Sequence, residues 1–237
     1  MFEFSIIKQM ASIFTPEFSF SDNLFLLNLF HEISDNKFDG KLFSAPIPQD
    51  APAEIPRLIL HSKDEAWKLE VSLERINLIY IHPELSSLTN PDALDFGNFA
   101  NKFIQSYKRK SKIRIQRLAF VIDRAAETKE TTPAQYIANT FCKDKYLQRP
   151  FNKTSSFELH SLKKYEFKNF DINSWVRLKS GQLLDQLRTP ILHVINDINT
   201  LAYQEAPDIN FELSDVERFF KFIPEHLESI LSLYFNK

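Results

Sequence analysis

The chain has 237 residues, of which 43% are hydrophobic and 25% are charged, and its formal net charge is −2. This length suffices for one large domain or two small ones. The near-neutral charge excludes a global electrostatic attraction to nucleic acid or to anionic lipid. No apolar run approaches the roughly 18–20 residues that a membrane-spanning helix requires, so no membrane association is expected.

Cysteine content and the first residues predict a cytoplasmic protein. Cys142 is the only cysteine, which excludes a disulfide within the chain and favours a reducing compartment. The opening residues, MFEFSIIKQM, have neither the basic region nor the long apolar core of a signal peptide.

The three glycines, Gly40, Gly97 and Gly181, are isolated from one another. Loops that close on a phosphate need clustered glycines, so nucleotide-binding loops of the P-loop and Rossmann types are excluded, as is the nucleophile elbow of α/β-hydrolases. We therefore expect no cofactor. The 23 phenylalanines predict a large aromatic core, with a cavity for an apolar ligand as the alternative.

In chain order, residues 2–7 predict a short strand, and residues 21–34 predict a helix capped by Ser21 or Asp22. The stretch SAPIPQDAPAEIP, residues 44–56, carries four prolines and predicts an extended connection. Too little chain precedes it to fill a separate core. We interpret it as an internal crossing of a single domain that spans residues 1–237.

Residues 67–73 alternate apolar and polar side chains, and a turn at Glu74-Arg75 leads to a more apolar return strand at 76–81. Asn90-Pro91 is typical of a helix start. The helix that follows carries an apolar stripe of Phe96, Phe99, Phe103 and Tyr107. A strand is then expected over residues 113–124.

The remaining patterns are a helix start at Thr132-Pro133, with Gln135 completing a capping box, and three strand-like runs at 155–167, 172–181 and 191–201. A closing helix is predicted from Ser214, with Glu217 as its capping partner and a kink at Pro224. This order favours an α+β fold: a mainly antiparallel sheet of about six or seven strands, with amphipathic helices packed on one face.

The stretch SYKRKSKIRIQRLAFVID, residues 106–123, is the most strongly patterned in the chain. Its cations at 108–110 fall in the last turn of a predicted helix, where the helix dipole favours positive charge. The following residues alternate as in a strand with one solvated face. We interpret the cluster as structural. Contact with an acidic protein or with nucleic acid is the alternative use of Lys108, Arg109, Lys110, Lys112 and Arg114.

Histidines and carboxylates offer one weak candidate site. None of the six histidines has the spacing of a metal motif, so no metal site is expected. On strands, Glu158 and His160 would share a face, as would His193 and Asp197. If those strands paired, the four side chains could act as base and orienting group. Solvated positions of an antiparallel sheet would give the same pattern.

Two further features are open to more than one interpretation. Cys142 follows an expected short helix and fits a small buried apolar residue better than a nucleophile. Arg117, Asp123 and Arg124 flank the apolar run LAFVI of a central strand. These charges could pair with neighbours or mark a site.

Three stretches carry a family resemblance: PRLILHSKDEAWKLEVSLERINLIYIHP, RLAFVIDRA and LHVINDINTLAYQ. With them the chain resembles a sporadically distributed bacterial family of similar length, to which no function is assigned. Ala119 stands where that family has a glycine, and the strand is one residue shorter. The resemblance implies a single α+β domain and carries over no catalytic residue. Scattered occurrence would suit an accessory protein of mobile or defence-type loci, an analogy only.

The sequence therefore favours a non-catalytic cytoplasmic module that binds another protein. One alternative is an enzyme or ligand-binding protein that uses the polar sheet face around His160, His193 and Asp197. The other is a nucleic-acid binder that uses residues 108–117.

Overall fold

A computed structural model describes residues 2–16, 23–44, 48, 50–83, 90–128, 132–143, 148–149, 152–183, 188–202, 205–206 and 208–235. The fold is α+β, as predicted. Nine strands form one antiparallel sheet in the order β2-β3-β4-β5-β1-β6-β9-β8-β7. The strands are β1 (Ser5–Phe14), β2 (Leu42–Ser44), β3 (Leu58–His61), β4 (Trp67–Val71), β5 (Arg75–Ile81), β6 (Arg117–Glu127), β7 (Glu158–Phe167), β8 (Phe170–Gln182) and β9 (Pro190–Thr200). The helices are α1 (Asn23–Ile33), α2 (Ala93–Ser111), α3 (Pro133–Phe141) and α4 (Leu213–Tyr234).

The expected strand number of six or seven was too low, and the first strand is longer than expected. β2 has only three residues, too few to leave a periodic pattern. β1 runs to Phe14 rather than ending at residue 7, because β5 and β6 pair with it on both sides. The strand before the proline-rich crossing thus lies in the middle of the sheet. The extent of a single domain over the whole chain stays a prediction.

Three predicted boundaries are wrong, and at the two helix starts the reason is that a neighbouring carboxylate forms the cap. Helix α2 begins after Asp92, whose carboxylate accepts a hydrogen bond from Asp95 N–H (2.8 Å). Helix α4 is capped by Glu212, whose N–H donates to the Asp215 carboxylate (2.9 Å), in place of the Ser214–Glu217 pair. Residues 112–116 form no strand, and β6 starts at Arg117.

Of the other predicted helix features, the Thr132 cap is confirmed, the Gln135 capping box is not formed, and the expected caps of α1 lie outside the described residues. Thr132 caps α3 by accepting from Gln135 N–H (3.2 Å), although the Gln135 side chain donates to Asn139 instead of closing the box. Pro224 lies inside α4, which runs on past it as one helix. Ser21 and Asp22, the expected caps of α1, are not among the described residues.

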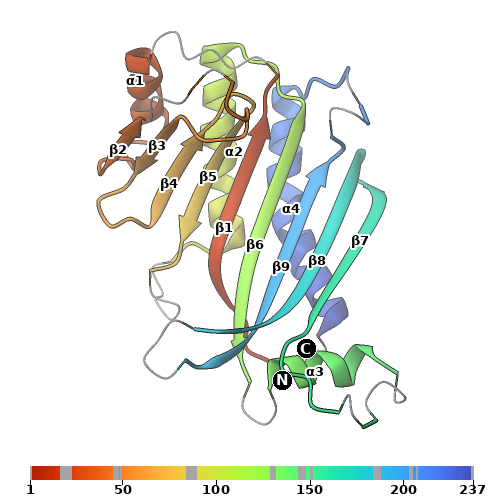
Figure 1. Ribbon diagram of the computed structural model, residues 1–237. Helices are drawn as coiled ribbons and strands as arrows, with labels where there is room; N and C mark the ends of the chain where they lie inside the picture. The colour runs from red at the N-terminus through yellow and green to blue at the C-terminus, as the bar shows by residue number, and fades with distance from the viewer. Residues whose placement is uncertain are drawn as a thin grey trace.

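Helices α2 and α4 pack side by side on one face of the sheet, behind it in the view of Figure 1. Phe120 of β6 lies beneath both, with its ring centroid 5.6 Å from that of Phe96 in α2 and 6.1 Å from that of Phe220 in α4. Helix α3 packs at the far end of β7, β8 and β9, near both ends of the chain. Its Phe141 ring approaches Tyr234 of α4, so it lies on the same side. The large aromatic core predicted from composition is confirmed.

A buried cation ties α4 to the sheet. Arg124 of β6 is only 1% exposed. Its guanidinium donates to Asn196 Oδ1 of β9 (2.8 Å) and forms an ion pair with Glu228 of α4. A charge buried in this way is tolerated only when it is paired and hydrogen-bonded. The pair therefore fixes the position of α4 over β6 and β9.

Helices α2 and α4 approach each other closely at Gly97. A Cβ atom there would lie 2.8 Å from Pro224 Cγ and 3.0 Å from the carbonyl oxygen of Phe220. Real Cβ atoms essentially never come as close as 2.8 Å to another heavy atom, and a contact of 3.0 Å is tighter than most. Glycine therefore lets the two helices meet, and the helices must separate if any side chain is added.

We expect Gly97→Ala to lower the melting temperature by several degrees. Overpacking a well-filled contact costs roughly 1–3 kcal/mol, which exceeds the gain of about 1 kcal/mol in helix propensity. Gly181→Ala is the matched control, because its new Cβ would meet only ordinary contacts, the nearest at 3.5 Å. Calorimetric melting of both variants checks this expectation. Equal melting temperatures for the two variants would contradict it.

Candidate functional site on the open sheet face

The face of the sheet opposite α2 and α4 is called the open face here, because no helix of the described chain packs on it. Strand register places a row of apolar residues across this face, and each residue lies opposite the next one on the neighbouring strand. The row has one interruption, because Asp197 of β9 lies between Val121 and Trp175. The row consists of Ile79, Met10, Val121, Trp175 and Leu162. Most of these side chains are only partly exposed.

A carboxylate–imidazole pair lies beside this row. His193 Nε2 of β9 is 3.9 Å from Asp123 Oδ2 of β6, and both side chains are mostly buried. The Nε2 atom is inaccessible and has no hydrogen-bond partner among the described residues. The nearest charged group to this nitrogen is the Asp123 carboxylate, so the two side chains form a pair beneath the surface of the open face.

Burial dominates the protonation of this pair. Burial lowers the pKa of His193, and Lys179 and Lys8 lower it further, while the Asp123 charge acts in the opposite direction. Burial also raises the pKa of Asp123, against the attraction of Lys8, His193 and Arg177. His193 is therefore neutral near pH 7, where the site contains an imidazole base and not an imidazolium acid.

Paired charges surround the Asp123–His193 pair. The Arg177 guanidinium lies 3.5 Å from an Asp197 carboxylate oxygen. Glu158 lies 3.7 Å from the Lys179 ammonium and 3.3 Å from His160 Nε2. The rim of the site is thus a set of opposite charges and has no single sign.

The structure brings the four predicted candidates to the open face, but the strand of Glu158 and His160 does not pair with the strand of His193 and Asp197. Because β8 lies between β7 and β9, Glu158 and His160 contact each other and not His193. Asp197 pairs with Arg177, and His193 faces Asp123. The sequence pattern identifies Asp123 only as a charge that flanks the apolar run LAFVI, and not as a partner of His193. Alternation within β6 could have shown that it points away from Phe120 and Ile122.

Lys8, Arg177 and Lys179 belong to the site although they were not predicted as members. The expected strand ended at residue 7, which left Lys8 outside the sheet. Arg177 and Lys179 alternate correctly in β8, but only the pairing of β8 with β9 shows which carboxylates they meet.

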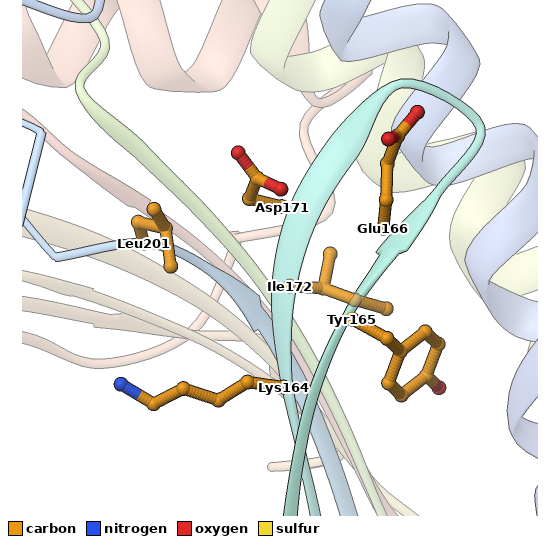
Figure 2. A pocket seen from close by; sticks show the side chains of 6 residues that line it. All are labelled: Lys164, Tyr165, Glu166, Asp171, Ile172 and Leu201. Carbon is orange, nitrogen blue, oxygen red and sulfur yellow. The ribbon is translucent and has the colours of Figure 1, made fainter.

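The other chemically reactive or concave features lie away from the Asp123–His193 pair. Within the described ranges, no group of three or more His, Cys, Asp or Glu side chains could hold a metal ion. Cys142 is a free, half-buried thiol at the end of α3. A pocket of about 250 Å³ lies at the β7–β8 hairpin, lined by Lys164, Tyr165, Glu166, Asp171, Ile172 and Leu201. In Figure 2, Tyr165 points to the opposite side of the hairpin from Lys164 and Asp171.

The basic stretch joins α2 to the start of α4. Lys108 lies 3.4 Å from Asn210 Oδ1 in the segment before α4, which also accepts from Ile115 N–H (3.2 Å). Lys110 forms an ion pair with Glu32 of α1, and Arg109 donates to Gln105 (2.6 Å). These contacts favour the structural interpretation. Lys112 and Arg114 are exposed.

We expect the triple variant Lys108→Gln, Arg109→Gln, Lys110→Gln to fold normally, with a loss of some tenths of a kcal/mol at each position from the helix dipole. Neither it nor the wild type should shift DNA or RNA at physiological salt. A mobility-shift titration across salt concentrations checks this. Wild-type binding with a steep salt dependence that the triple variant lacks would contradict it.

We expect the His193 ring to titrate with a midpoint below the ordinary value of about 6.5. Because the folded pKa is lowered, the stability that neutral His193 contributes is present above pH 6.5 and is lost as pH falls toward the folded pKa. The pKa values of His82 and His226 are lowered by burial too, so their contributions have the same sign.

Ring NMR titration measures this midpoint, with His193→Gln used to assign the resonance. Asp123→Asn should lower the midpoint further, because it removes the charge that favours the imidazolium. A wild-type midpoint at or above 6.5, or a rise in the Asp123→Asn variant, would show that burial does not control this group.

Comparison with known proteins gives no identity: no family model matches the chain, and no curated protein matches it significantly. No helix of the described residues is both long and apolar enough to cross a membrane.

Proposed function

We propose that this protein is a cytoplasmic interaction module, without catalytic activity of its own, that binds another protein through the open sheet face. The observation that carries the proposal is the apolar row from Ile79 to Leu162, which lies next to a rim of paired charges. Antiparallel sheets commonly have one face solvated, but solvated faces usually carry polar side chains. Here methionine and valine occupy the central strands β1 and β6, and tryptophan occupies β8, next to the edge.

The composition of the open face is that of a protein interface. Interfaces combine an apolar centre rich in aromatic residues and methionine with a polar rim. Trp175 and Met10 fit the centre, and the Lys179–Glu158 pair fits the rim, while Asp197 of the Arg177–Asp197 pair lies within the row. The pocket at the β7–β8 hairpin is lined by none of the row residues, and its 250 Å³ is below the usual range of roughly 300–1,000 Å³ for small-molecule sites.

The charges of the face argue against a nucleic-acid partner. A groove that follows a phosphate backbone needs cations with little competing negative charge. On the open face Asp123, Asp197 and Glu158 alternate with the cations and would repel phosphates. The scattered family that the sequence resembles suggests, by analogy, that the partner belongs to a mobile or defence-type locus.

Site-specific photo-cross-linking identifies the partner. A benzoylphenylalanine placed at Trp175 should capture the same protein repeatedly in cells that express the chain natively. The same group at Leu233, an exposed position on α4, should not capture it. Labelling of one protein with equal yield from both positions would contradict the proposal.

Once the partner is identified, we expect Ile81→Glu to weaken its binding to the chain about tenfold or more, because a charge beside the apolar row must be desolvated in the complex. Leu94→Glu on α2 is the matched control, since Leu94 is 41% exposed and Ile81 is 44% exposed. Calorimetric titration of both variants measures the difference. Equal affinities would place the interface elsewhere.

A further inference from the structure

Strand β7 forms one edge of the sheet. Its ten residues pair with β8 in continuous register from Glu158 to Phe167, without a bulge. The other edge, β2, has only three residues. A long edge without proline or bulge can pair with another strand unless its charges prevent it. Of the two edges among the described residues, β7 is therefore the one long enough to pair with a further strand.

One hydrogen bond shows which backbone groups of β7 point outward. Ser180 N–H donates to Phe157 O (3.1 Å), so residues 157 and 180 form a hydrogen-bonded pair of the β7–β8 ladder. Such pairs alternate along an antiparallel ladder. The N–H and C=O groups of the odd-numbered residues thus face β8. The outward groups belong to Glu158, His160, Leu162, Lys164 and Glu166.

We propose that a second copy of the chain pairs with this edge, antiparallel, with Ser161 opposite Ser161 of that copy. Glu158 then lies opposite Lys164, and by symmetry this pair forms twice. His160 lies opposite Leu162. Opposite charges on facing residues stabilise strand pairs, and like charges destabilise them.

Neighbouring registers lack this complementarity. Pairing centred on Leu162 places Glu158 opposite Glu166, and pairing centred on Lys163 places that ammonium opposite itself. Pairing centred on Lys164 places that ammonium opposite itself too, and registers centred before Ser161 or after Lys164 pair fewer residues of β7. The charges of β7 therefore select the register centred on Ser161, and this self-complementarity is the reason to choose a second copy over an unrelated strand.

Such a dimer would make one continuous sheet. Its twofold axis is perpendicular to the sheet, so both open faces lie on the same side and adjoin along β7. The inference does not rest on the proposed function, because it depends on the β7 backbone and charges and not on the apolar row. It would, however, present two copies of that row to one partner.

The first test is sedimentation velocity of the purified chain over a wide concentration range. The wild type should approach twice the monomer mass of 27.8 kDa. Leu162→Pro removes an outward N–H and no bond to β8, so it should weaken self-association about tenfold or more while the fold is kept. Leu162→Thr, which keeps the N–H, is the matched control and should dimerise.

The second test uses charge and applies even if the proline variant fails to fold. Glu158→Lys and Lys164→Glu should each weaken the dimer, and the double variant should restore it. A wild type that stays monomeric overturns the proposal, even if β7 then pairs with a strand of a different protein. A folded Leu162→Pro variant that dimerises fully overturns it too. Failure of the double variant to recover overturns the register.

Discussion

The contact between α2 and α4 at Gly97 is the constraint on which the rest of the architecture depends. Helices normally pack 8–10 Å apart, at a distance set by the side chains between them. Here the glycine brings Pro224 and the Phe220 carbonyl directly against α2. Both long helices then fit side by side over the central strands, where Phe120 fills the space beneath them. With both helices on one face, the other face is left without a helical layer.

Two consecutive residues of β6 show what this arrangement does to charge. Arg124 points to the helices, where it is buried and must be paired, and Glu228 and Asn196 supply its partners. Asp123 points to the open face, where burial is incomplete and its pKa is raised without a close ion pair to a lysine or arginine. β6 thus places a charge that holds α4 on one face and a charge of the candidate site on the other, because successive strand residues alternate between faces.

The open face combines segments that are distant in the chain. Lys8 and Met10 come from β1, Asp123 from β6, Trp175 from β8 and His193 from β9. No short motif encodes such a surface. The properties of such a surface depend on which residue types the strands carry and on the register that places them side by side. For that reason the apolar row with its paired rim says more about function here than any single residue does.

Local patterns in the sequence determined the fold class, the β4–β5 hairpin, the cap of α3 and the basic last turn of α2, because these depend on residues close in the chain. Local patterns also placed His160, His193, Asp197 and Glu158 on strands. Only the tertiary structure decided the length of β1, which pairing on both sides sets, and the cap of α4, where Asp215 pairs with Glu212. It alone decided that His193 faces Asp123, because the neighbour of each strand depends on long-range pairing that alternation within one strand cannot encode.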